Sequence, residues 1–480
     1  MKSSYTILHI SDLHKEKSSD YENLYASLCT DCEQYTSEGI EKPSLIVVSG
    51  DLVEGSKNND IDEAKAEIKQ QYGEVTTFLL KLVDFFLEGD KRRIIIVPGN
   101  HDVCRAISNN SMLPEKVNNP KEIRNKRDDM IKGNTRWSWD DLSFYSVTNH
   151  ERYASRLDLF VEFYNNFFAG IREWVQPCEK TANIIELPDY RVGFFALNSC
   201  HRLDHLNHIG SIYPNAISSN QRSLTSMHNK GELLIGVWHH HTMGLPCDNN
   251  YLDYRIIQSL ISSHIKVGLY GHQHQITLLN EYRDLTQNDR ILLISSGSLY
   301  GGRKQLVTGC PRQYCLLALD FHESDVDLTL HVRKDVSTTY EIPAWTTSQI
   351  GTSVEISHKE NIQIKPFDID RILGDIDSRV QKSSDFKQGV KAMLSFDDIA
   401  HDKVMSFIDS YLSKIDDYEF IKTFVSSPQT ESQFYSFWRA SIETKDKSAI
   451  TKAMQSHYYN TAKGVMYNYL KEETTKIFGL

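Results

Sequence analysis

The sequence has no uninterrupted apolar run of about 18 residues, the length that a helix needs to cross a bilayer. Its N-terminal apolar stretch is interrupted at His9 and again at Asp12, too early for the core of a secretion signal. We therefore expect neither a membrane span nor a signal peptide. The expected protein is soluble and cytoplasmic, with no membrane partner.

Cysteine is also scarce, since eight residues are scattered through 480 without the dense spacing of a disulfide scaffold. This distribution suits a reducing compartment in which the thiols stay free. Cys29 and Cys32 form a lone CxxC pair. Because Leu24, Leu28 and Tyr35 surround them at helical spacing, we expect two thiols carried by a helix and not a redox or zinc site.

An excess of positive charge is missing, because 64 acidic residues outnumber 53 basic ones and the formal net charge is −11. Attraction to nucleic acid would therefore have to come from a local basic patch. The hydrophobic content of 40% is that of an ordinary globular protein, and no internal repeat or low-complexity tract is visible. We expect the whole chain to fold, with room for about two or three domains.

Short apolar strands alternate with amphipathic helices up to about residue 340, which predicts an α/β architecture built around sheets. Helical spacing is clearest in residues 64–86, where apolar side chains recur every three or four positions. The alternation lapses in residues 103–180, where we expect a helical insertion. Residues 341–364 are expected to be a linker, and residues 365–480 a separate all-α C-terminal domain.

Five short polar motifs follow predicted strands, at the place where ligands usually bind in α/β folds. They are Asp12-Leu13-His14, Gly50-Asp51, Gly99-Asn100-His101-Asp102, His239-His240-His241 and Gly271-His272-Gln273-His274. Carboxylate oxygen together with neutral imidazole suits divalent manganese, iron or zinc, whereas an all-oxygen shell suits magnesium or calcium. The glycines before Asp51, Asn100 and His272 would let the backbone bend sharply into the site.

The order and placement of these motifs resemble the calcineurin-like metallophosphoesterase superfamily over about residues 5 to 335. The repair nucleases and the class III cyclic-nucleotide phosphodiesterases are the branches to which the chain is similar. The resemblance implies a two-sheet sandwich flanked by helices. It also implies two divalent metal ions, manganese in the first place and otherwise iron, zinc or a mixed pair, that activate water for attack on a phosphoester.

The family pattern, carried over position by position, implies two groups of metal ligands. The ligands of the first ion would be Asp12, His14, Asp51 and His274. The ligands of the second ion would be Asn100, His239 and His272, together with the bridging Asp51.

Two more residues of the third motif have implied roles. His101 would face the substrate and protonate the leaving oxygen or stabilise the developing charge, and Asp102 would orient His101. One ligand position stays open, because the family usually shows one histidine or His-His-Pro where this chain has three histidines. Distance from the strand end favours His239, and His240 is the alternative.

The insertion begins directly after the His101 loop, so we expect it to overhang the active site and to select the substrate. It holds cations that could contact phosphates, followed by rings that could stack on bases. These residues are Lys121, Arg124, Lys126, Arg127, Lys132, Arg136, Trp137 and Trp139. The alternative, a solvated helix followed by two core tryptophans, stays open because acidic residues interleave with the basic ones.

Three further cations are candidate substrate contacts. Arg202 lies in a histidine-rich loop, and Arg303 and Lys304 lie on a glycine-rich loop; each could equally be an exposed turn residue. The C-terminal helices could bind a partner protein, form a dimer or cover the active-site cleft, or simply pack on themselves.

The function that we expect is metal-dependent phosphodiester hydrolysis, with DNA or RNA as the substrate. The alternative is hydrolysis of a small nucleotide, such as a cyclic nucleotide or a nucleotide pyrophosphate, at the same centre. A phosphoprotein phosphatase fits the residues around the motifs less well. A non-catalytic scaffold also fits less well, because all seven ligand positions are filled.

Overall fold

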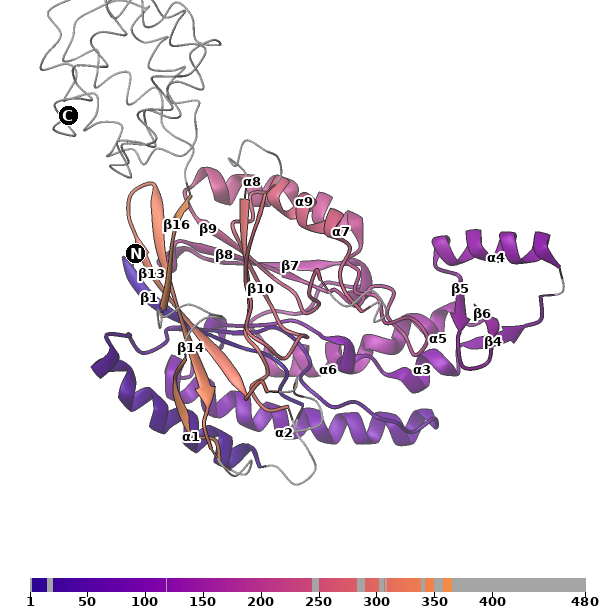
Figure 1. Cartoon of the computed structure of the whole chain (residues 1–480), viewed down its shortest axis with the longest axis horizontal. Helices are drawn as coiled ribbons and strands as arrows, with labels where there is room; N and C mark the ends of the chain where they lie inside the picture. Colours follow the sequence, from indigo (N-terminus) through magenta and orange to yellow (C-terminus); the bar gives the residue numbers. More distant parts are fainter. Residues whose placement is uncertain are drawn as a thin grey trace, which may run out of the picture. The chain divides into compact units, whose positions relative to one another are not determined.

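In the part of the chain that the structure describes, two mixed sheets pack face to face at the centre of the computed structural model (Figure 1). The first has the strand order β15-β14-β13-β1-β2-β3, with β16 also paired to β14, and the second has the order β11-β12-β10-β9-β8-β7. The described residues are 2–14, 20–117, 119–243, 250–282, 290–301, 306, 309–337, 342–348 and 357–364. They all belong to one unit, Met1–Ile364.

The first sheet combines a parallel half with an antiparallel half. The parallel strands are β1 (Ser4–Ile10), β2 (Leu45–Val48) and β3 (Ile94–Ile96). The antiparallel strands are β13 (Gln313–Phe321), β14 (Asp325–Asp335), β15 (Trp345–Ser348) and β16 (Ser357–Gln363). The parallel half places the carboxyl ends of its strands at one edge of the sandwich.

The second sheet is parallel at its centre and antiparallel at both edges. Its central strands are β8 (Val192–Leu197), β9 (Leu233–Val237), β10 (Val267–Tyr270) and β12 (Arg290–Ser295). Its edge strands are β7 (Ala182–Leu187) and β11 (Leu278–Tyr282). The predicted two-sheet α/β fold is therefore confirmed.

The core between the sheets is one continuous apolar cluster that contains Ile10 and Val47 of the first sheet and Phe194 and Leu269 of the second. The central strands are apolar on both faces because helices cover their outer sides. Each fully buried aliphatic side chain contributes about 1.5–3 kcal/mol relative to an exposed one. The sandwich is thus a rigid support for the loops at its edge.

Helices cover the outer faces of both sheets (Figure 1). On the first sheet lie α1 (Tyr21–Tyr35) and α2 (Ile61–Leu87), and on the second lie α7 (Pro214–Ser218), α8 (Gln221–Asn229) and α9 (Tyr254–Ser262). The carboxylate of Asp60 starts α2 by accepting the backbone N–H groups of Asp62 and Glu63 at 3.0 Å. The helical face predicted in residues 64–86 is buried, as expected.

The insertion is only partly helical, which corrects the expectation of a helical segment. Its helices are α3 (Arg105–Asn109), α4 (Pro120–Lys132), α5 (His150–Ala154) and α6 (Asp158–Phe167). Between them β4 (Met112–Glu115), β5 (Thr135–Ser138) and β6 (Ser143–Val147) form a small antiparallel sheet. Trp137 and Phe144 face each other across β5 and β6 with ring centroids 4.8 Å apart, and such cross-strand pairs favour a hairpin over a helix.

Residues 341–364 do not form a linker as expected, because β15 and β16 lie within them and both pair with β14. The side chain of Trp345 fills the space beside α1, where its indole N–H donates to the Ser27 hydroxyl at 2.9 Å. The predicted C-terminal domain, residues 365–480, lies outside the described residues. Among the described helices, none combines the length and apolarity required to cross a membrane.

Candidate metal centre

The five predicted motifs meet at one edge of the sandwich. Asp12 follows β1, Asp51 follows β2 and Asn100 follows β3, while His239 follows β9 and His272 follows β10. Backbone hydrogen bonds join the first two loops, since the Asp12 N–H donates to Gly50 O at 3.1 Å. The parallel strands thus bring together residues that lie up to 262 positions apart in the sequence, from Asp12 to His274.

Three of the predicted residues form a first group. The ligand atoms of Asp12, His14 and His274 all lie within 4.8 Å of one another. His274 Nε2 is 3.1 Å from Asp12 Oδ1, and His14 Nε2 is 3.8 Å from the same oxygen. Asp12 and His14 are fully buried, so this group is closed to bulk water on one side.

A second group contains Asp51, His239 and His272, again within 4.8 Å of one another, with Asn100 among them. Asn100 Oδ1 lies 3.1 Å from His239 Nε2 and 2.8 Å from His272 Nδ1. Asp51 Oδ2 is 3.1 Å from the same His239 Nε2. Asp51 also lies within ligand distance of His14, which places its carboxylate between the two groups.

His239, and not His240, joins this cluster. Its Nδ1 donates to the carbonyl oxygen of Ser49 at 2.8 Å, so Nε2 is the ring nitrogen that faces the oxygens of Asp51 and Asn100. Nε2 donates a hydrogen bond to these oxygens when it carries a proton, and it can bind a metal when that proton is displaced. The ring of His240 lies beside that of His272, with centroids 4.8 Å apart, but its Nδ1 is 2.8 Å from the Ser199 hydroxyl, and His240 is not grouped with Asp51. The positions of the two rings therefore favour His239 as the ligand at the position that the sequence left open.

Four of the clustered residues have a backbone conformation that non-glycine residues rarely adopt. The φ angles are +55° for Asp12, +51° for Asp51, +73° for His272 and +52° for His274. Left-handed backbone at a non-glycine residue costs energy, and such strain concentrates at functional sites. The surrounding sandwich holds these side chains in place against that cost.

The glycines of the motifs matter mainly because they let two backbone segments approach closely, and less because they let the backbone bend. Gly50 has a φ of +96° and fits the expected sharp turn. Gly99 has an ordinary φ of −116°, but a Cβ atom there would collide with the backbone and the carboxylate of Asp51. Gly99 therefore allows the loop after β3 to pass directly against Asp51.

The electrostatics of the cluster favour positive charge beside its two carboxylates. Burial alone would raise the pKa of both carboxyl groups, but the neighbouring His274 holds the pKa of Asp12 well below its usual range, and His239 does the same for Asp51. Burial alone would lower the histidine values, yet the Asp12 carboxylate raises the pKa of His14 to about 10 and Asp51 raises that of His239 to about 9.

These observations fit a pair of divalent metal ions. Sites that hold protons on imidazoles beside ionised carboxylates can exchange those protons for a metal cation. Both ring nitrogens of His14 and the Nε2 atom of His272 are buried without a hydrogen-bond partner in the described part of the chain, although Glu54 lies 3.4 Å from His14 Nδ1. The mixture of imidazole nitrogen with carboxylate and amide oxygen suits manganese, iron or zinc.

The structure assigns Asp102 a different role from the expected one. The ring of His101 is held by the backbone, with Nδ1 donating to Glu54 O at 2.8 Å, and not by Asp102. Asp102 is fully buried and accepts hydrogen bonds from Gly99 N at 2.7 Å, Leu52 N at 3.3 Å and Tyr72 OH at 2.9 Å. It ties two of the site's loops together and does not orient His101. Burial, followed by the nearby Asp51, raises the pKa of Asp102 to about 7.

His101 itself lies at the mouth of the cluster. Its backbone N–H donates to Asp51 Oδ1 at 2.8 Å, and its ring stacks on that of His14 with centroids 4.9 Å apart. Because Nδ1 is occupied by a carbonyl acceptor, Nε2 is the atom that can exchange a proton with a bound molecule.

The predicted substrate contacts are less clustered than the predicted metal ligands. Arg202 is exposed and lies beside Gly133 at the end of α4, where its Nε is 3.4 Å from the position of a Cβ on that glycine. Arg303 and Lys304 lie outside the described residues. Arg136 is wrong as a phosphate contact, because it is buried in an ion pair with Asp204, Nε to Oδ2 at 2.7 Å.

The two tryptophans of the insertion differ. Trp137 packs against Phe144, as the structural alternative expected, whereas Trp139 is 78% exposed at the turn between β5 and β6. Most of α4 is exposed as well, including Lys121, Arg124 and Arg127.

Sequence reasoning missed the groups that support the cluster. Glu54 and Tyr72 are the clearest examples, and Tyr72 lies within residues 64–86, for which the sequence predicted only the apolar face of a helix. The position of Glu54, three residues after Asp51, was the single available signal, because Tyr72 reaches Asp102 only through the tertiary fold.

Comparison with known proteins gives a family. A family model described as calcineurin-like phosphoesterase matches residues 5–276, more than half of the chain. None of the curated proteins matches. Among solved structures, a dimetal phosphatase from Danio rerio has 13% sequence identity and a TM-score of 0.35, over 76% of this chain and 100% of that chain. The calcineurin-like phosphoesterase YfkN from Bacillus subtilis has 12% identity and a TM-score of 0.29, over 76% of this chain and 92% of that chain.

Proposed function

We propose that this chain, which belongs to the calcineurin-like phosphoesterase family and is a metal-dependent phosphoesterase, hydrolyses the phosphodiester bonds of DNA or RNA. The observation that carries the choice of substrate is the insertion. The insertion begins directly after the His101 loop. It contains the basic helix α4 and the exposed side chain of Trp139.

In this proposal the metal centre is the pair of groups described above, with manganese as the first candidate. Asp12, His14 and His274 would hold one ion, Asn100, His239 and His272 the other, and Asp51 both. When bound, the two ions supply Lewis acidity at the phosphoryl oxygens and water activated for attack at neutral pH.

The protein's own contribution to the chemistry is positioning and proton transfer. His101, fixed through its Nδ1–H by Glu54 O, would donate a proton from Nε2 to the leaving oxygen. Tyr72 and Asp102 would hold the His101 loop against the loop after β2, because Asp102 accepts hydrogen bonds from backbone N–H groups of both loops.

The base of the insertion is firmly attached next to this centre. Arg156 is fully buried and donates to Leu203 O at 2.9 Å and to Glu179 at 2.6 Å, while its own carbonyl accepts the Cys104 N–H at 2.9 Å. The α4 segment beyond this base is solvated and carries Lys121, Arg124 and Arg127. A basic helix with an exposed indole suits a phosphate backbone with unstacked bases.

The experiment is metal-reconstituted hydrolysis by the full chain. Labelled single- and double-stranded DNA and RNA, cyclic nucleotides and a bis-aryl phosphodiester are compared in manganese, with Asp51→Asn as the inactive control. We expect nucleic acid to be cleaved faster than the small esters. Absence of nucleic-acid cleavage in manganese, iron and zinc, with the bis-aryl ester still hydrolysed, would refute the substrate while leaving the reaction class intact.

A triple variant of α4 tests the insertion itself. Lys121→Ala, Arg124→Ala and Arg127→Ala together should raise the KM for nucleic acid about tenfold or more at physiological salt, since each lost phosphate contact weakens binding. Hydrolysis of the bis-aryl ester should not change. Lys69→Ala, an exposed cation on α2 that pairs with Glu162, is the matched control. Equal KM values in the triple variant and the control would contradict the assignment.

A further inference from the structure

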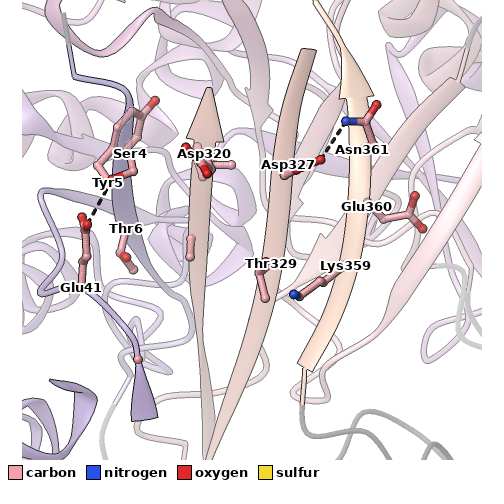
Figure 2. Close-up of a pocket in the computed structure, with 13 residues that line it drawn as sticks. Ser4, Tyr5, Thr6, Glu41, Asp320, Asp327, Thr329, Lys359, Glu360 and Asn361 are labelled. Atoms are coloured by element: carbon pink, nitrogen blue, oxygen red, sulfur yellow. Dashed lines mark hydrogen bonds between the residues drawn. The ribbon is translucent and has the colours of Figure 1, made fainter. Parts of the chain in front are cut away.

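A groove of about 630 Å³ opens on the first sheet, at the end of β1 opposite to Asp12 (Figure 2). Such a volume lies within the range of about 300 to 1,000 Å³ that small-molecule sites occupy. Two rows of side chains cross β1, β13, β14 and β16 at paired register positions. The rows are Ser4, Asp320, Asp327 and Asn361, and Thr6, Ala318, Thr329 and Lys359.

The first row sets two like charges opposite each other. Asp320 and Asp327 are direct cross-strand partners on the same face, and like charges in that relation destabilise a sheet. Asp327 is compensated by Asn361 Nδ2 at 2.7 Å and His322 Nε2 at 3.1 Å. Within the described residues, no side chain forms a hydrogen bond or an ion pair with Asp320, which is exposed at the groove.

The net charge of the lining is negative. Glu41 stands across the groove from Lys359 in Figure 2 and accepts the Ser4 hydroxyl at 3.0 Å. Glu360 is already paired with Arg290 at 3.1 Å. Among the described residues that line the groove, three acidic groups (Glu41, Asp320 and Asp327) then remain against the single ammonium of Lys359. His322, beside Asp327, offsets one of these charges only when its ring is protonated.

The floor of the groove holds an unsatisfied hydroxyl. Thr6 is 0% exposed, and its Oγ1 atom has no hydrogen-bond partner in the described part of the chain. A buried polar atom without a partner costs about 1–3 kcal/mol, and a hydrogen bond from a bound molecule would offset that cost. Thr6 Oγ1 can accept a hydrogen bond, as the carboxylates above it can.

We propose that this groove binds a small aliphatic polyamine, with one ammonium group between Asp320 and Asp327, another near Glu41, and an N–H group donated to Thr6. The net excess of two negative charges matches at least two ammonium groups. A divalent metal ion fits less well. The described groups with metal-ligand spacing include Asp327, with His322 and Asp325, but neither Glu41 nor Asp320. The groove is also much larger than one ion.

Isothermal titration calorimetry with spermidine tests the proposal. The full chain is first loaded with manganese, so that the carboxylates of the metal centre do not compete, and the titration is run at physiological salt. We expect one spermidine per chain. Asp320→Asn should weaken the affinity about tenfold or more, because it removes a charge-assisted hydrogen bond.

Two further variants separate binding from folding. Thr6→Val should weaken spermidine binding severalfold without lowering the melting temperature, because the hydroxyl has no partner in the protein to lose. Asp140→Asn, the same charge change at an exposed position between β5 and β6, should leave the affinity unchanged. The proposal is overturned by absence of spermidine binding, by equal losses in Asp140→Asn and Asp320→Asn, or by unchanged affinity in Thr6→Val. Binding of magnesium or calcium that excludes spermidine would overturn it as well.

Discussion

Two buried clusters of charged side chains, the metal centre at the edge of the sandwich and a group around Arg333 on the first sheet, differ in how completely their hydrogen bonds are satisfied. In the metal centre, His14 and His272 keep ring nitrogens that no described residue satisfies. In the other cluster, Arg333 on β14 is fully buried and its guanidinium donates to Asp31, to Glu38 at 2.6 Å and to Thr347 at 2.8 Å.

This difference in hydrogen bonding distinguishes side chains that stabilise the fold from side chains that are available to bind a ligand. A buried arginine with its donors paired fastens β14 to α1, and its partners in the described part of the chain belong to the fold itself. A buried ring nitrogen without a hydrogen-bond partner among the described residues, such as Nε2 of His272 on its left-handed backbone, is poised for a ligand from outside the chain. Four substitutions should sharpen this contrast, from the largest effect to the smallest.

Asp51→Asn should abolish phosphoesterase activity. The loss should exceed the roughly 10²- to 10⁴-fold that general acid–base catalysis contributes, because Asp51 lies within reach of both groups of ligands. Circular dichroism should still show the folded chain, and bound manganese, measured by elemental analysis, should fall. A variant that retains both metal and activity would show that Asp51 is not shared between the groups.

His101→Ala should lower kcat by about 10²- to 10⁴-fold and leave the metal content unchanged, since His101 faces the cluster from its mouth. An ester with a good leaving group needs less protonation, so its hydrolysis should be affected least. An equal loss for good and poor leaving groups would argue against proton donation by His101.

Arg333→Met should lower the free energy of unfolding by about 3–5 kcal/mol, because it leaves the buried Asp31 without its cation. Activity per folded molecule should be unchanged, the reverse of Asp51→Asn. The measurement is chemical denaturation. Lys69→Ala, whose ion pair with Glu162 is about half exposed on both sides, should cost no more than about 1 kcal/mol. Similar losses in these two variants would remove the contrast between a buried pair and a surface pair.

Glu232→Gln should change the pH dependence of stability. Burial, followed by the neighbouring Glu186, raises the pKa of Glu232 from 4.5 to about 7. The fold therefore favours the protonated form, and stability falls as the pH rises from 4.5 through 7. Glutamine stays neutral, so the variant should be more stable than the parent at pH 8, by about 1 kcal/mol, and equally stable at pH 4. Thermal melts across this range provide the test, and parallel curves for the two proteins would contradict the assignment.

The sequence predicted the metal centre more fully than the rest of the molecule. Each ligand motif stands at the end of an apolar strand, and parallel strands must bring such ends together. The role of Asp102 was wrong because its partners, Tyr72 and the backbone of Leu52, come from other loops and leave no spacing in the chain.

Expectations outside the parallel strands were less successful. The strand Ser357–Gln363 is mostly polar, since Ile362 is its only aliphatic residue. The sequence therefore predicted a linker at this position and not a strand. The position of this strand is set by pairing with β14, which no local pattern reveals. Arg136 likewise read as a surface cation, although Asp204, 68 residues away, holds it inside the fold.

The sequence by itself determined the order of the strands' apolar runs, the ligand types and the class of chemistry, because these depend on residue identity and on short spacing. Only the tertiary structure decided which of three neighbouring histidines turns inward, which carboxylate lies between the two groups, and that Asp12, Asp51, His272 and His274 take a left-handed backbone. Ring direction and backbone strain are set by packing and hydrogen bonds from distant segments, such as the Ser49 carbonyl that orients His239.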